Sequence, residues 1–216
     1  MDVVRESLLK ASAFTLIMVL LGVFVGLQMD NLRQDHLSQE LRQSNLETET
    51  FVALQSYIEG SENYCELMQV RVPDINRRSA ELGSKLTQLE GQNLGNDTEY
   101  DYIRGRYYNN QIQLYSALKK YEGQCGVNQT KVLFFFDESI DSQRQGEVLN
   151  ELVQETNISI FSFNSELERP EVGKSPVVEV LKADYNVTEA PTLIVNDERK
   201  LEGFISKREL QNEVLQ

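Results

Sequence analysis

A run of nineteen residues without a charged side chain, from Ala11 to Met29, most constrains what this chain can fold into. As an α-helix, the run would rise about 28 Å, close to the thickness of one hydrocarbon core. A cleaved signal peptide would have a shorter apolar region and a small-residue cleavage site, which Leu27–Asp30 does not provide. A buried core helix would carry a polar face, which the run lacks. We therefore predict a transmembrane helix over residues 11–29, with residues 1–10 in the cytoplasm.

Two glycines inside this run have the spacing of a helix-packing motif. Gly22 and Gly26 form a G-x-x-x-G pattern, which lets two membrane helices approach closely. The same spacing also occurs in helices that face only lipid. The predicted partners are the lipid bilayer and either another protein or a second copy of the chain, bound through the span and the stalk that follows it.

The charge balance excludes some classes of partner. Lys and Arg number 21 and Asp and Glu number 34, a formal net charge of −13. Nucleic-acid binding releases counterions through basic side chains, so we expect no nucleic-acid partner. The same deficit argues against a basic patch on anionic lipid.

Four potential glycosylation sites bear on the orientation. The Asn-x-Ser/Thr pattern occurs at Asn96, Asn128, Asn157 and Asn186, where about two occurrences would be expected by chance. All four follow the uncharged run, and basic residues on its two sides are balanced. We therefore expect a single-pass protein of the cell membrane with its C-terminal part outside the cytoplasm. Asn157 and Asn186 lie beside predicted strands, where burial would prevent modification.

Residues 30–127 are predicted to form a stalk of three helices, as a hairpin or coiled coil. Val72-Pro73 is expected to end the first helix near Met68, because a residue before proline disfavours helical backbone. Each predicted helix carries a stripe of mostly apolar residues three and four positions apart. The stripes consist of Leu37, Leu41, Phe51, Leu54 and Ile58 in the first helix, Ile75, Ser79, Leu82, Leu86 and Leu89 in the second, and Ile103, Tyr107, Leu114, Leu118 and Tyr121 in the third. We expect the second and third helices to be antiparallel and to pack on the first.

The predicted arrangement of the helices brings the two cysteines to the same end of the stalk. Cys65 and Cys125 would lie at the same distal level of the stalk, where a disulfide could join them. Such a bond would stabilise a thin core by roughly 4 kcal/mol. Two free thiols or a redox-active pair are the alternatives, although redox pairs usually have C-x-x-C spacing.

Residues 128–216 show the pattern of an α/β domain. Apolar runs, helical spacing and turn residues predict the order βαβαββα. The expected elements are strands over 131–136, 158–163, 191–195 and 200–204 and helices over 141–156, from Pro176 and over 206–215. The predicted fold class of the whole chain is therefore α/β, with a transmembrane helix and a helical stalk before this domain.

The C-terminal pattern resembles the thioredoxin-like fold. The stretch from Tyr185 to Val195 is similar to that family's approach to a cis-proline, which the resemblance assigns to Pro191. It implies a binding surface of Ala190, Pro191 and Thr192 beside a loop with Ser139 and Ser142, which stand at the spacing of the family's C-x-x-C cysteines. A hydroxyl cannot exchange a disulfide, so the family's thiol chemistry cannot run in this domain. The whole arrangement resembles archaeal membrane-anchored thioredoxin-like proteins.

Other catalytic chemistry finds no support in the sequence. The chain has a single histidine, His36, in the predicted stalk, so neither a Ser-His-Asp set nor a histidine metal site can form in the C-terminal domain. Asp137, Glu138 and Asp141 suit a solvated helix start better than a cation site. We predict no cofactor, no bound metal and no catalytic residues.

The favoured hypothesis is a membrane-anchored, extracytoplasmic binding or scaffolding protein with a redox-inactive thioredoxin-like domain. The first alternative is a thiol-disulfide oxidoreductase or redox-coupled chaperone that uses Cys65 and Cys125. The second is a structural subunit of a larger membrane or cell-surface assembly.

Overall fold

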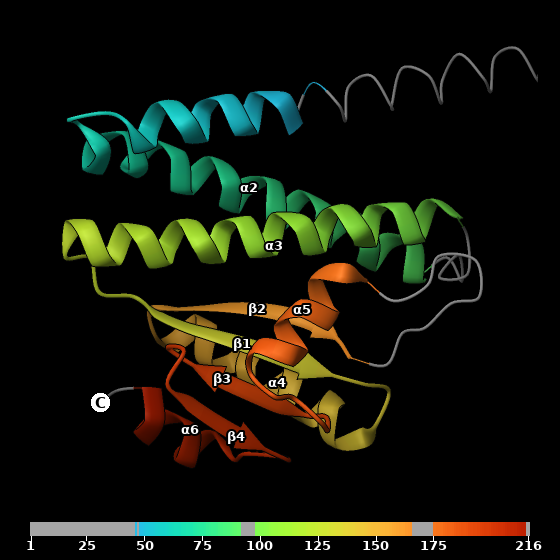
Figure 1. Ribbon diagram of the computed structural model, residues 1–216. Helices are drawn as coiled ribbons and strands as arrows, with labels where there is room; N and C mark the ends of the chain where they lie inside the picture. Colours follow the sequence, from blue (N-terminus) through green and yellow to red (C-terminus); the bar gives the residue numbers. More distant parts are fainter. Residues whose placement is uncertain (1–45, 47, 92–97, 166–174, 215–216) are drawn as a thin grey trace, which may run out of the picture. The chain divides into compact units, whose positions relative to one another are not determined.

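The structure is a computed structural model that describes residues 46, 48–91, 98–165 and 175–214 (Figure 1). The contacts group the chain into two units, residues 1–62 and 63–216. In the first unit, residues 48–59 are helical. The predicted transmembrane segment, with Gly22 and Gly26, and the potential glycosylation site Asn96 lie outside the described residues.

The predicted fold class needs a correction. No helix within the described ranges is long and apolar enough to cross a membrane. The two longest helices, α2 (Tyr64–Gly91) and α3 (Thr98–Cys125), have 28 residues each, but both carry many charged side chains. The corrected description, for the residues that the structure describes, is an α/β fold of helices and a four-stranded sheet.

The helical pair α2–α3 departs from the sequence prediction at its start. Residues 60–63 separate two helices, and α2 then runs through Pro73, which we expected to end a helix. Proline removes one backbone hydrogen bond from a helix interior. Met68 and Ile75, each 1% exposed, anchor the helix on both sides of Pro73, so packing offsets the missing bond.

The two helices are antiparallel and share a mixed core. Most of the predicted heptad positions are buried, and polar side chains cross between the helices at mid-length. The Asn110 side-chain amide donates to the Ile75 carbonyl at 3.1 Å, and Gln111 Nε2 donates to Ser79 Oγ at 3.0 Å. The pair therefore depends on buried hydrogen bonds as well as on apolar packing.

The sheet has the strand order β2-β1-β3-β4. Strand β1 (Thr130–Phe136) is parallel to β2 (Ile158–Asn164) and antiparallel to β3 (Thr192–Val195), which forms a hairpin with β4 (Arg199–Glu202). Asn196 and Asp197 make the hairpin turn at positive φ angles of 51° and 64°, which these residue types tolerate. Strand β2 is thus an edge strand.

Helices cover both faces of this sheet (Figure 1). Helices α4 (Ile140–Glu155) and α6 (Lys207–Val214) pack on one face, where Leu149, Leu152 and Leu210 join the core. Helix α3 packs on the other face beside α5 (Pro176–Asp184). The apolar run of β1 is buried on both faces, as expected for a central strand. The element order from β1 to α6 is βαβαββα.

Candidate functional site

The two serines at the C-x-x-C spacing belong to a hydrogen-bonded helix start. Ser139 is the N-cap of α4, and its Oγ accepts from the Ser142 backbone N–H at 3.2 Å. Both hydroxyls donate to Asp137 Oδ1. Burial raises the pKa of Asp137, but these hydrogen bonds outweigh it, and the net pKa lies below the usual value. The serines therefore stabilise the loop that they occupy.

At the predicted proline surface, Pro191 and Thr192 form hydrogen bonds within the chain. The Ala190–Pro191 peptide bond is cis, as the resemblance implies. The Pro191 carbonyl accepts from the Gly203 N–H at 2.8 Å, and the hydroxyl of the fully buried Thr192 donates to the Glu189 carbonyl at 2.7 Å. These bonds fix the start of β3 against the turn after β4.

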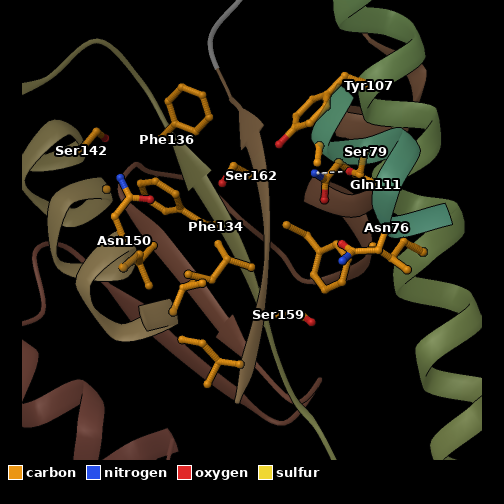
Figure 2. Close-up of a pocket in the computed structure, with 18 of the residues that line it drawn as sticks. Asn76, Ser79, Tyr107, Gln111, Phe134, Phe136, Ser142, Asn150, Ser159 and Ser162 are labelled. Atoms are coloured by element: carbon orange, nitrogen blue, oxygen red, sulfur yellow. Dashed lines mark hydrogen bonds between the residues drawn. The ribbon is translucent and has the colours of Figure 1, made fainter. Parts of the chain in front are cut away.

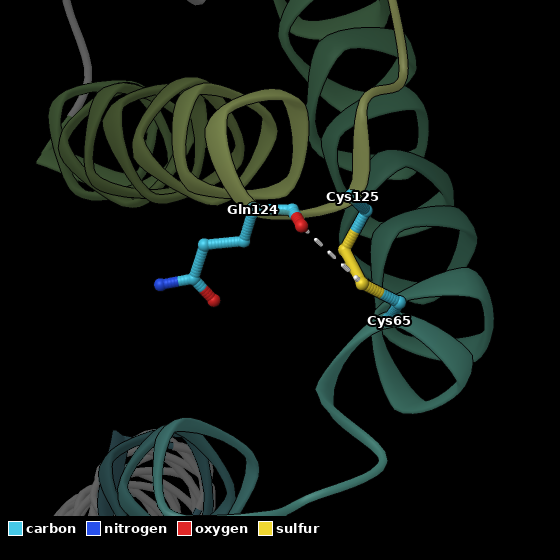
Figure 3. The surroundings of a disulfide bond; sticks show 3 residues. All are labelled: Cys65, Gln124 and Cys125. Carbon is cyan, nitrogen blue, oxygen red and sulfur yellow. Dashed lines mark hydrogen bonds between the residues drawn. A yellow bond between two sulfur atoms is a disulfide. The ribbon is translucent and has the colours of Figure 1, made fainter.

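Cys65 and Cys125 are joined by a disulfide in the structure, with their Cα atoms 5.7 Å apart (Figure 3). Cys65 lies in the first turn of α2 and Cys125 at the last residue of α3, so the antiparallel pair brings them to the same end. Sequence analysis placed Cys65 at the end of a helix rather than at the start of one. The pairing is the same because both arrangements put the cysteines at one level.

Three potential glycosylation sites lie within the described residues. Asn128, Asn157 and Asn186 are all exposed. Burial beside the strands therefore does not prevent modification of Asn157 or Asn186.

A pocket of about 930 Å³ runs along β2, with α4 on one side and the helical pair on the other. We call it the β2 groove. Figure 2 shows the two groups of side chains facing each other across the strands. Its polar lining residues are Asn76, Ser79, Tyr107, Gln111, Gln129, Asp137, Ser142, Gln143, Asn150, Ser159 and Ser162. This volume is within the range of small-molecule sites.

Every second residue of β2 directs its backbone N–H and C=O groups toward the groove. The Ser165 N–H donates to the Phe136 carbonyl on β1 at 2.7 Å, whereas the Asn164 N–H points away from β1 and donates to the Tyr108 hydroxyl at 3.1 Å. Because bonding direction alternates along a parallel strand, the N–H and C=O groups of Ile160 and Ser162 also point away from β1. No group in the described part of the chain bonds to them.

Gln111 adds a buried acceptor to the groove. Its side chain is 5% exposed, and its Nε2 donates to Ser79 Oγ. Its Oε1 has no hydrogen-bond partner among the described residues. A buried acceptor without a partner costs roughly 1–3 kcal/mol, so a bound donor group would recover that energy. Nearby, burial raises the pKa of Tyr107, which keeps its hydroxyl neutral.

The lining is neutral apart from one carboxylate. Asp137 is its single charged residue, and Ser139 and Ser142 occupy one of its carboxylate oxygens. Within the residues that the structure describes, no three His, Cys, Asp or Glu side chains gather as metal ligands do. The β2 groove can therefore accept an uncharged ligand that forms hydrogen bonds.

The groove overlaps only one end of the predicted site. Ser142 is part of its lining, whereas Ser139, Ala190, Pro191 and Thr192 are not. Sequence analysis missed Gln111, although a signal exists: it lies between Tyr107 and Leu114 on the apolar side of α3, at a position where a polar side chain must find a buried partner.

No family model matches this chain, and no curated protein matches it. Among solved structures, one described as "Structure of a malarial protein" matches with a TM-score of 0.31 and 19% sequence identity, over 41% of this chain and 100% of that chain. A likeness at this TM-score supports no conclusion about fold or function. Membership of the thioredoxin-like family stays a prediction.

Proposed function

We propose that this chain is a binding protein without catalytic activity of its own, and that it holds an uncharged segment of a protein partner in the β2 groove. The observation that carries this proposal is the lining of a pocket of about 930 Å³, whose hydrogen-bonding side chains are neutral except for Asp137. Burying a charged group there would cost much more than burying an amide or hydroxyl. The groove therefore favours polypeptide with neutral side chains.

The serines at positions 139 and 142 support a redox-inactive role. The Ser139 hydroxyl caps α4 by accepting from the Ser142 N–H, and both hydroxyls donate to Asp137. A serine hydroxyl neither forms nor exchanges a disulfide. In this proposal, the thioredoxin-like domain serves as a scaffold for binding.

An oxidising compartment is the proposed location. The disulfide between Cys65 and Cys125 would be stable outside the cytoplasm, and the exposed Asn128, Asn157 and Asn186 are accessible for glycosylation there. Intact mass before and after reduction tests this location. Added glycan mass and thiols that alkylate only after reduction support it, and an unmodified mass with freely alkylated thiols contradicts it.

A pair of glycine substitutions tests the binding function. Gly146 lies in α4 and lines the groove, whereas Gly123 lies in α3 outside it with open space around it. Dodecapeptides selected from a random phage-displayed library on the oxidised full chain are resynthesised and titrated by fluorescence polarisation. We expect Gly146→Leu to weaken binding at least ten-fold by filling the groove, and Gly123→Leu to leave it unchanged. Equal effects of the two variants, or no selected peptide, would contradict the proposal.

The oxidoreductase alternative has its own readout. Insulin reduction by dithiothreitol is followed with and without the purified chain. We expect the same rate in both, because the disulfide joins helix ends sixty residues apart in sequence and has no C-x-x-C partner. A rate that rises with chain concentration and is lost in Cys65→Ser would establish the enzyme instead.

A further inference from the structure

We propose that the β2 groove binds its partner as an additional β-strand, paired with the free edge of β2. This inference rests on the proposed binding function and states the form of the ligand. The bound segment is an extended, uncharged stretch of polypeptide whose backbone pairs with Ile160 and Ser162. In this arrangement the partner becomes a fifth strand next to β2.

The free edge is short and has a defined end. Ile160 and Ser162 direct their backbone groups away from β1, and both residues line the groove. At the next outward position, the Tyr108 hydroxyl already accepts the Asn164 N–H. Tyr108 thus ends the available edge. A strand that follows residues 158–162 would span about five residues, because paired strands rise by nearly equal amounts per residue.

Unpaired backbone groups at this edge favour such a ligand. Strand edges present rows of donors and acceptors that natural proteins usually cover, charge or shorten. Around β2, the lining instead provides apolar side chains that a bound strand could contact: Ala80, Leu114, Phe136, Leu149 and Val153. A helical ligand has its backbone groups bonded internally and cannot pair with β2.

The two sides of the groove set the side-chain preference. Successive side chains of a bound strand point in opposite directions, toward α4 on one side and toward α3 on the other. The α4 side offers Gly146 and Asn150, which suit a small or amide side chain. The α3 side offers the Gln111 Oε1, which needs a donor. The preferred ligand carries Asn, Gln, Ser or Thr toward α3.

Alternate N-methylation of the peptide provides the sharpest test, because it leaves the protein unchanged. A resynthesised binding peptide is methylated at one backbone amide at a time and titrated against the oxidised full chain. Strand pairing uses every second amide of the ligand. We expect methylation at alternate positions to weaken binding about ten-fold or more, and methylation at the positions between them to have little effect.

Two substitutions in the protein test the same edge. Ser162→Pro removes an N–H that does not bond to β1, so the sheet keeps its own hydrogen bonds, as edge strands allow. Ser162→Val keeps the N–H and the strand preference. We expect Ser162→Pro to weaken peptide binding about ten-fold and Ser162→Val to retain it, with matching circular dichroism spectra for both variants.

Hydrogen exchange gives a third readout. On binding, the amides of Ile160 and Ser162 should exchange more slowly, whereas the Asn164 amide, already bonded to Tyr108, should change little. If peptides bind and Gly146→Leu weakens them, but methylation shows no alternation, the binding function stands and strand addition is wrong. If no peptide binds, both the binding function and strand addition are wrong.

Discussion

The helical pair and the sheet with its helices are stabilised in different ways. Among the described residues, the largest fully buried apolar side chains include nine from the sheet and helices α4 and α6, against Met68 and Ile75 in the helical pair. The disulfide lies in the helical pair, and the region from Thr130 onward has no cysteine. The covalent bond is therefore found where apolar burial is weakest.

This difference teaches how helices packed on a sheet can hold a groove open. A thin helical core with buried polar bonds could separate easily from the sheet, and the cross-link limits that freedom by joining the two helix ends. The sheet needs no such bond, since β1 is buried on both faces. We infer that the position of the helical pair beside β2, and so the width of the groove, depends on the disulfide.

Loss of the disulfide should lower the free energy of unfolding more than any other change proposed for the two regions. We expect Cys65→Ser with Cys125→Ser to destabilise the chain by about 4 kcal/mol, because the bond closes a loop with a sequence separation of 60 residues. Urea unfolding measures the change. Hydrogen exchange should show faster exchange in α2 and α3 than in β1 and β2. The double variant should not respond to reductant, which controls for other effects of reduction, and uniform loss of protection across the sheet would contradict the comparison.

The next largest effect on stability should come from removing a buried leucine, and the loss should differ between the two cores. Leu152 is 0% exposed beneath the sheet, and Leu86 is 9% exposed in the helical pair. We expect Leu152→Ala to cost about 3 kcal/mol and Leu86→Ala about 2 kcal/mol, since a shallower site loses less buried area and leaves a cavity that water reaches. Thermal unfolding of the oxidised chain measures both. A larger loss for Leu86→Ala would reverse our ranking of the cores.

Much of the sheet could be predicted from sequence, because its physics is local. Three local signals each predict their own element. The apolar run of 131–136 and the alternation after Ile158 predict strands, and Asn196-Asp197 predicts a turn. The same rules did not predict that the helices break at residues 60–63 and that α2 then continues through Pro73. Pro73 carries a strong local signal to end a helix, yet burial of Met68 and Ile75 on either side outweighs it.

The candidate site was less predictable, because it forms between elements. Ser139 and Ser142 were selected by their spacing, but Ser139 is the N-cap of α4 and both hydroxyls donate to Asp137. The β2 groove combines residues from α2, α3, α4 and an edge strand. The order of the strands in the sheet decides which strand lies at the edge. Local patterns in the sequence do not determine that order.

The connection between the two regions should show a smaller effect. The hydroxyl of Tyr115 on α3 donates to Asp197 in the β3–β4 turn, which also accepts from Tyr185. We expect Tyr115→Phe to cost about 2 kcal/mol, as for a hydrogen bond to a charged group. Tyr102→Phe is the matched control, because the Tyr102 hydroxyl is buried without a hydrogen-bond partner among the described residues. Its removal should be neutral or stabilising in urea unfolding, and equal losses would show that Tyr115 acts through packing alone.

The pH dependence of the sheet region should give the smallest effect, and its sign follows from Asp137. Hydrogen bonds from Ser139 and Ser142 outweigh burial and hold the pKa of this carboxyl below its usual value near 4. A carboxyl with a lowered pKa in the folded state contributes stability above the unfolded pKa and loses it as pH falls through the folded pKa. Asp137→Asn keeps an oxygen acceptor but does not titrate. We therefore expect the wild type to be more stable than Asp137→Asn above the unfolded pKa near 4, and this advantage to be lost as the pH falls through the lower, folded pKa of Asp137. A constant difference across this range would show that the cap does not depend on the charge of Asp137.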